Sequence, residues 1–195
     1  MTCFGLAHPR KPTMLTEPVF FDTDCLSSFL TTHEEDILVE LYTNRIRVPA
    51  VVRRELSPPW RPDLRDAIDG FLNSGKATLQ DIDVESEAHE LFRQLTNPSS
   101  PGIKALGNGE AACLVLARAN EGVIASNNLR DVMSRVREYH LRLATTGIII
   151  YEAVGRQILT RDQAVIVWEQ MVDRGFQLGA LTYDDYIQKK GYDLR

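Results

Sequence analysis

Pro18-Val-Phe-Phe-Asp22 is the stretch that decides the fold. Its apolar and aromatic run is typical of a buried strand, and the run ends in an acid. A helical pattern follows at once, and further short apolar runs return later in the chain with helical patterns between them. This alternation predicts an α/β fold in which a mostly parallel central sheet is flanked by helices on both faces.

The other elements are predicted from spacing and capping residues. Strands are expected at residues 45–48, 77–82, 123–126 and 141–143, and helices at residues 49–56, 63–72, 86–95, 110 onward and 129–140. Thr32 and Glu35 have capping-box spacing, which predicts that a helix starts after Thr32. Two or three helices fill the remainder. One of them is capped by Thr160, ends at Gly175 and carries an apolar stripe formed by Ala164, Val165, Val167, Trp168 and Met171.

Composition and charge indicate an ordinary globular chain. It has 195 residues, 44% of them apolar, and 22 Lys and Arg against 27 Asp and Glu, which gives a net charge of −5. The length favours one domain with a small appendage. The acidic balance argues against a protein that holds nucleic acid by bulk charge, because that mode needs an excess of Lys and Arg. A local basic surface is still compatible with the acidic net charge of the whole chain.

The cysteines and apolar runs bear on the compartment. Cys3, Cys25 and Cys113 are too few and too scattered for a disulfide framework, so we expect free thiols and a reducing cytoplasm. No apolar run approaches the roughly 20 residues that cross a bilayer. The first residues lack the order of a signal peptide, so secretion and membrane insertion are not expected.

Polar side chains follow the predicted strands at positions where α/β proteins bind ligands. In open parallel sheets that place is the carboxyl end of the strands. Asp22 ends the first strand, Asn127 and Asn128 follow a later one, and Glu55 and Glu110 lie on adjoining helices. Crowded carboxylates repel one another unless a cation lies between them, and oxygen ligands suit Mg²⁺ or Mn²⁺. Such a metal would support phosphodiester hydrolysis.

These residues resemble the PIN-domain nucleases, especially the toxin ribonucleases of bacterial and archaeal toxin–antitoxin pairs. The resemblance covers residues 18–155 and rests on four motifs in order: Val19-Phe-Phe-Asp22-Thr-Asp, Val48-Pro-Ala-Val-Val-Arg-Arg-Glu55-Leu, Leu106-Gly-Asn-Gly-Glu110-Ala-Ala and Val123-Ile-Ala-Ser126-Asn-Asn128. It implies a PIN-like domain at residues 18–155. A flexible arm at residues 1–17 would precede it, and a helical extension at residues 156–195 would pack on it. The extension resembles the end of PIN proteins described only as nucleic-acid-binding.

The resemblance also implies roles for individual residues. Asp22, Glu55 and Glu110 match the family's acidic catalytic residues, with Asp22 and Glu110 as ligands of Mg²⁺ or Mn²⁺. At the fourth acidic position this chain has Asn128, whose amide brings no charge and cannot act as a base. Asp131, one turn further on, is a substitute metal ligand, and Asp24 lies two residues from Asp22.

The implied activity is a metal-dependent endoribonuclease, acting as the toxin of a toxin–antitoxin pair. Implied partners are the RNA substrate, a cognate antitoxin protein and a second copy of the chain in a homodimer. Candidate RNA contacts are Asp24, Ser126, Arg130 and Arg135; the two arginines belong to a basic run that can steer a phosphate backbone or simply form a solvated helix face.

Two other functions remain open at this point. Asn128 is compatible with a PIN-like module that has lost turnover and only holds RNA or a protein. Asp22-Thr-Asp24 also matches the nucleophile and acid of a haloacid-dehalogenase-like phosphatase, although the later half of the chain lacks a convincing acidic pair at a strand end.

Overall fold

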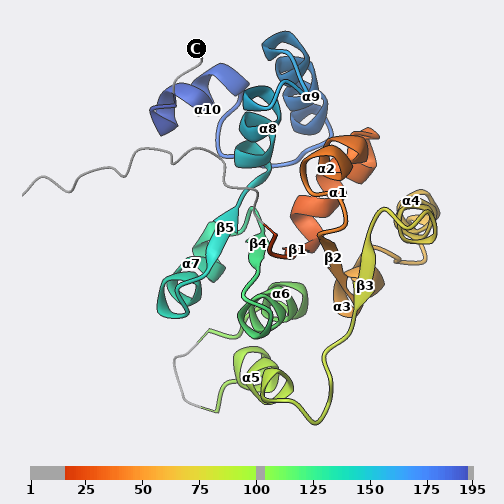
Figure 1. The fold of residues 1–195 in the computed structure, drawn as a ribbon, viewed down its shortest axis with the longest axis vertical. Helices are drawn as coiled ribbons and strands as arrows, with labels where there is room; N and C mark the ends of the chain where they lie inside the picture. Colours follow the sequence, from red (N-terminus) through yellow and green to blue (C-terminus); the bar gives the residue numbers. More distant parts are fainter. Residues whose placement is uncertain (1–15, 100–103, 193–195) are drawn as a thin grey trace, which may run out of the picture.

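A five-stranded parallel sheet forms the centre of the molecule (Figure 1). The computed structural model describes residues 16–99 and 104–192. The predicted arm at residues 1–17 therefore falls almost wholly outside the described residues, as do Cys3 and part of the loop near residue 100. The strands are β1 (Val19–Phe21), β2 (Ile46–Pro49), β3 (Thr78–Gln80), β4 (Val123–Ala125) and β5 (Arg142–Ala144).

Helices cover both faces of this sheet, so the predicted α/β class is confirmed. On one face α6 (Asn108–Ala119) contacts β1, β2 and β4, and α5 (Glu87–Thr96) packs outside it. On the opposite side lie α1 (Thr23–Thr32), α2 (Glu35–Leu41) and α8 (Thr146–Gly155). The other helices are α3 (Ala50–Glu55), α4 (Pro62–Asn73), α7 (Leu129–Glu138), α9 (Arg161–Asp173) and α10 (Tyr183–Lys190).

The strand order is β3-β2-β1-β4-β5, with all pairs parallel. The chain builds outward from β1 in one direction through β2 and β3, and then returns to build in the other direction through β4 and β5. The order therefore reverses between β1 and β4, which is the position where open α/β sheets leave a crevice at the carboxyl ends of the strands. Phe21 pairs with Ala125 there, and the Asp22 N–H donates to the Ala125 carbonyl over 2.8 Å.

The core follows from the apolar runs of the sequence. Val19, Phe20 and Phe21 are all buried because β1 is the central strand and has helices on both faces. In α6 the small side chains of Ala111 and Ala112 are fully buried, which is consistent with the close contact of this helix with three strands. Cys25 and Cys113 are buried free thiols, as predicted.

The last two helices pack on the rest of the molecule. α9 contacts α1 and α8, and Trp168 on α9 is fully buried against Tyr183 and Tyr186 of α10, with ring centroids 5.7 and 5.0 Å away. Thr160 caps α9 as predicted. Within the described residues, no helix is long and apolar enough to cross a membrane.

One predicted helix start is wrong. Thr32 is the last residue of α1, where its hydroxyl donates to the Ser28 carbonyl over 2.8 Å, and α2 begins only at Glu35. The capping-box spacing was misleading because His33 takes a left-handed backbone conformation (φ 60°) that ends α1. Thr32 therefore closes one helix and does not open the next.

Candidate functional site

An open cleft of about 570 Å³ lies at the carboxyl ends of β1 and β4, where the strand order reverses. Its walls come from five parts of the chain that are far apart in sequence. They are the start of α1, the end of α3, the start of α6, the segment after β4 and the segment after α9. The lining residues are Asp22, Thr23, Asp24, Ser27, Glu55, Gly107, Gly109, Glu110, Asn127, Asn128, Gly175 and Gln177. We call this the acidic cleft, because four of these residues are carboxylates.

Asp22 is the most buried of the four carboxylates, with 4% of its surface exposed. It is the N-cap of α1, and its Oδ1 accepts a hydrogen bond of 2.7 Å from the Thr23 N–H. Its Oδ2 accepts a hydrogen bond of 2.8 Å from the Ser126 hydroxyl. Burial raises the pKa of Asp22 to about 7, and the charges of Glu110 and Glu55 act in the same direction against those two hydrogen bonds.

Glu55 reaches the acidic cleft from the last residue of α3. Its Oε2 accepts a short hydrogen bond from the Thr23 hydroxyl, and its Oε1 accepts one of 3.1 Å from the Gly109 N–H. That N–H belongs to the first turn of α6, where backbone donors have no partner within the helix. Glu55 thus ties the start of α6 to the start of α1.

Gly109 is required by this close approach. A Cβ atom at this position would lie 2.6 Å from Glu55 Oε2 and 3.1 Å from Asp22 Oδ1. The two carboxylates therefore converge on the same point above the first turn of α6. Any side chain at residue 109 would occupy the space between them.

Glu110 faces the cleft from the first turn of α6 and is linked to Asn128. Its Oε2 accepts a hydrogen bond of 3.1 Å from the Gly107 N–H, which closes the helix start. Its Oε1 accepts a short hydrogen bond from the Asn128 amide. The same amide nitrogen donates to Asp131 Oδ2 over 3.1 Å. Asn128 therefore bridges two carboxylates as a donor.

Asp24 and Asn127 complete the wall beside α1. Burial raises the pKa of the Asp24 carboxyl, and a hydrogen bond with Asn127 acts against this. The Asn127 amide also donates to the Thr146 hydroxyl over 2.9 Å and accepts from the Thr146 N–H over 2.9 Å. These bonds fix the segment after β4 against the start of α8.

The structure thus brings Asp22, Asp24, Glu55, Glu110 and Asn128 together in one cleft. Ser126 is fully buried beneath Asp22, so it has no surface for the direct RNA contact that the sequence suggested. Its hydroxyl instead orients the Asp22 carboxylate.

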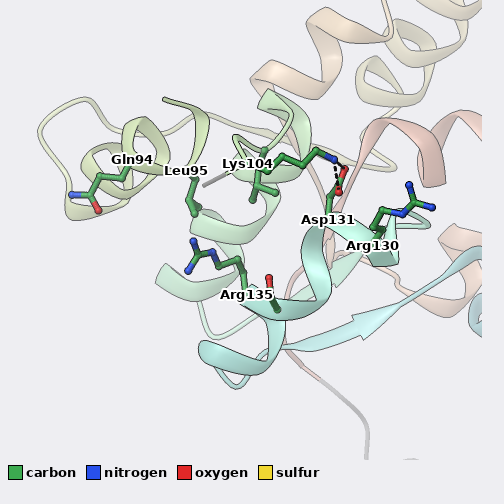
Figure 2. A pocket seen from close by; sticks show the side chains of 8 residues that line it. Gln94, Leu95, Lys104, Arg130, Asp131 and Arg135 are labelled. Carbon is green, nitrogen blue, oxygen red and sulfur yellow. Dashed lines mark hydrogen bonds and ion pairs between the residues drawn. The ribbon is translucent and has the colours of Figure 1, made fainter. Parts of the chain in front are cut away.

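Asp131, Arg130 and Arg135 lie outside the acidic cleft. They line a neighbouring cavity of about 230 Å³ between α5, α7 and the segment before α6 (Figure 2), together with Gln94, Leu95, Lys104, Leu106 and Ser134. Lys104 binds both oxygens of Asp131, at 2.6 and 2.7 Å. Lys104, together with the Asn128 amide, lowers the pKa of Asp131. In this arrangement Asp131 is paired with a lysine and is not directed at Asp22.

The donor set of the acidic cleft is chemically suited to a hard divalent cation. Asp22, Glu55 and Glu110 offer only oxygen donors, and each carboxylate oxygen keeps a lone pair beyond its hydrogen bond. Burial is the main cause of the raised pKa of Asp22, and the neighbouring Glu110 and Glu55 carboxylates add to it. As the side chains of residues 16–99 and 104–192 lie, however, no three acidic, histidine or cysteine groups are placed to hold one ion together.

Several lining residues were not predicted from the sequence. Thr23 and Gly109 lie next to the acids in sequence, and each makes a contact that only the folded chain reveals. Asn127, which was expected at this strand end, lines the cleft as predicted. Gln177 lines the cleft from the segment after α9, where Gly175 has a left-handed backbone (φ 89°). Gly175 was predicted to end a helix. A glycine in the sequence indicates that the chain turns there, but it does not indicate that the turn lies beside the cleft.

No protein-family model matches the chain, and no curated protein matches it either.

Proposed function

We propose that the chain is a metal-dependent endoribonuclease of the PIN type. The observation that carries the proposal is the convergence of Asp22, Glu55 and Glu110 from three separate elements on one cleft, at the point where the strand order reverses. Structural carboxylates are usually dispersed or paired with Lys or Arg. In this cleft the described neighbours of these three are amides, hydroxyls and backbone N–H groups.

Asp22, Glu55 and Glu110 would hold Mg²⁺ or Mn²⁺ after a shift of their side chains, because no three such groups are placed to hold one ion as they lie in the described residues. The ion would supply charge neutralisation at the phosphate and activation of a water molecule. Ser126 and the Thr23 N–H hold the two oxygens of Asp22 in place, so this carboxylate is oriented before substrate arrives. Thr23 and the Gly109 N–H do the same for Glu55.

The open shape of the cleft supports a polymeric substrate. It is lined mainly by polar groups, and its Asn128 amide donates to Asp131 of a neighbouring cavity that also carries Lys104, Arg130 and Arg135. A strand of RNA can lie across both, whereas the acids alone would repel its phosphates. The neutral amides of Asn127 and Gln177 can hydrogen-bond to bases or ribose hydroxyls without adding charge.

The second candidate function is an RNA- or protein-binding module without turnover. The specific observation in its favour is that Asn128 donates to Glu110 and Asp131, so a neutral amide stands where a fourth acid would increase the affinity for a cation. The same residues would then hold RNA without cleaving it.

The resemblance in sequence extends the proposal to the cellular role. As the toxin of a toxin–antitoxin pair, the protein would act in the cytoplasm on cellular RNA, form a homodimer and be held inactive by an antitoxin. Light scattering of the purified protein tests the dimer, and co-expression with the product of the neighbouring reading frame tests the antitoxin.

Cleavage of a mixed RNA pool in Mn²⁺, Mg²⁺ or EDTA separates the two functions. The nuclease predicts cleavage with metal, none in EDTA, and loss of cleavage in Asp22→Asn. Asp66→Asn is the matched control, because it removes an exposed carboxylate that is paired with Arg65 on α4. RNA binding without cleavage in any metal would favour the binding module.

A further inference from the structure

Three basic side chains line the cavity beside the acidic cleft. Lys104, Arg130 and Arg135 line it together with one carboxylate, Asp131, although the whole chain carries a net charge of −5. Arg135 also forms an ion pair of 2.6 Å with Glu138, which does not line the cavity. Figure 2 shows Arg130 and Arg135 extending in different directions from α7, with the Lys104–Asp131 pair between them. Within the described residues Arg130 has no ion-pair partner, and Ser134 adds an unbonded hydroxyl.

The size of the cavity selects among ligands of negative charge. At about 230 Å³ it is smaller than the roughly 300–1,000 Å³ of pockets that enclose whole small molecules. Leu95 and Leu106 supply apolar walls, Lys104, Arg130 and Arg135 supply only donors, and Gln94 and Ser134 can donate or accept. A phosphate group fits within this volume and can accept hydrogen bonds from the basic side chains that line it.

The exposure of the Lys104–Asp131 ion pair would allow another anion to bind Lys104 in place of Asp131. Lys104 is the more exposed member, with 71% of its side chain exposed, whereas Asp131 is only 17% exposed and also accepts from Asn128. Surface ion pairs contribute little stability, so a second anion can compete for the ammonium group at small cost. A phosphodiester approaching Lys104 is such an anion.

The Asn128 side chain lies between the cavity and the acidic cleft. The Asn128 amide contacts Asp131 on one side and Glu110 on the other, so a single side chain separates the two sites. A strand that places one phosphate among the acids can therefore place a neighbouring phosphate in the basic cavity. When Lys104 turns to that phosphate, the Asp131 carboxylate is left without its cation at the edge of the acidic cleft.

We propose that this cavity is a phosphate-binding subsite for the RNA strand, in which a phosphodiester replaces Asp131 as the partner of Lys104 and so frees the Asp131 carboxylate beside Glu110. The inference rests on the proposed function. Under this proposal, Asp131 would supply the carboxylate that is absent at Asn128, and it would do so only when RNA is bound.

The test is RNA binding in EDTA, which needs no cleavage. Fluorescence anisotropy with a labelled single-stranded RNA of mixed sequence is measured over a range of salt concentrations. Lys104→Gln and Arg135→Gln should each weaken binding about tenfold, as expected for loss of a charged hydrogen bond. Each should also lower the salt slope by about 0.7, as expected for one lost phosphate contact on a single strand. Arg137→Gln, which removes an exposed arginine of α7 that does not line the cavity, is the control and should bind like wild type.

Equal effects of Arg135→Gln and Arg137→Gln would overturn the subsite, because they would show a diffuse charge effect. Inorganic phosphate added to the RNA complex distinguishes a small-anion site from a strand-binding site. If low millimolar phosphate displaces the RNA, the cavity is a site for small anions, and the proposal of an RNA subsite is overturned.

Asp131→Asn tests the exchange of partners. It should tighten RNA binding several-fold by releasing Lys104, and this gain should vanish when Lys104→Gln is also present. A gain of the same size in both backgrounds, or none at all, would overturn the exchange. Because all these measurements are made without metal, failure of the subsite is distinct from failure of the nuclease, which is tested by cleavage alone.

Discussion

Replacing Asp22 by Asn should make the protein more stable at high pH and less stable at low pH. Asp22 has a pKa of about 7 in the folded chain, against 3.8 for an unperturbed carboxyl. Between these two values the folded protein binds a proton that the unfolded chain has lost, so the free energy of unfolding falls as the pH rises from about 4 to 7. Above pH 7 the wild-type protein carries the whole cost of the buried charge.

The size of the effect follows from the same difference in pKa. At about 1.4 kcal/mol for each pKa unit, the buried charge costs about 4 kcal/mol above pH 7. The variant avoids this cost but weakens one hydrogen bond. The Thr23 N–H can still donate to the amide oxygen, whereas the Ser126 hydroxyl then faces an N–H group, a loss of about 1 kcal/mol. We expect a net gain of about 3 kcal/mol at pH 8 and a net loss of about 1 kcal/mol at pH 4.

Urea unfolding followed by circular dichroism, in EDTA at several pH values, measures this directly. The curves of stability against pH for wild type and Asp22→Asn should cross between about pH 4 and pH 7. Asp66→Asn, which changes an exposed carboxylate, should stay within about 0.5 kcal/mol of wild type throughout. Parallel curves for wild type and Asp22→Asn would refute the reasoning.

Three further predictions concern the walls of the acidic cleft. Gly109→Ala should lower the melting temperature and abolish cleavage, because its Cβ would lie 2.6 Å from Glu55 Oε2 and would displace that carboxylate. This cost outweighs the gain in helix propensity, which is about 1 kcal/mol. The control Gly70→Ala on α4, whose Cβ meets no atom within 4 Å, should show only the gain in helix propensity. Asn128→Asp should lower the free energy of unfolding in EDTA by about 1–3 kcal/mol, because the two hydrogen bonds that the amide donates to Glu110 and Asp131 become repulsions between carboxylates. Added Mg²⁺ should restore the melting temperature of the variant. A loss of stability that Mg²⁺ leaves unchanged would contradict this prediction. Gln177→Ala should leave the melting temperature unchanged and raise the KM for RNA roughly three- to tenfold, and an unchanged KM would exclude Gln177 from substrate binding.

The sheet and the identity of the acids at its edge were predictable from local patterns. The run Val19–Phe21 is typical of a buried strand, and a strand there places the acid after it at a strand end. β2, β4 and β5 were found at their predicted positions to within one residue at each start, because short apolar runs between helical patterns leave few alternatives. The parallel order then brings Asp22 and Asn128 to the same edge without further information.

The contacts that define the cleft were not predictable in this way. Glu55 and Gly109 are 54 positions apart, and only the packing of α3 against α6 lets the carboxylate accept from the glycine N–H. Asp131 was expected to replace the missing fourth acid, but its ion pair with Lys104, 27 positions earlier in the chain, could not be read from spacing. Local sequence determines which residue ends a strand, whereas long-range packing determines its partner.

The same limit explains the error at Thr32 and the omission of Gln177. A capping box is a spacing of two residue types, and Thr32 matches it while lying inside the preceding helix. Gln177 carries no signal of its own. It reaches the cleft because Trp168 anchors α9 and because the Arg174 side chain donates to the Thr31 carbonyl over 2.5 Å.

Binding of Mn²⁺ to the purified protein tests the central claim most directly. Electron paramagnetic resonance counts free Mn²⁺ during a titration of wild type, Asp22→Asn, Glu110→Gln and the control Asp66→Asn. The account predicts saturable binding by wild type and the control, and loss of that binding in the two cleft variants. Mn²⁺ binding that is absent from wild type, or that survives unchanged in both cleft variants, would contradict a metal site formed by these carboxylates.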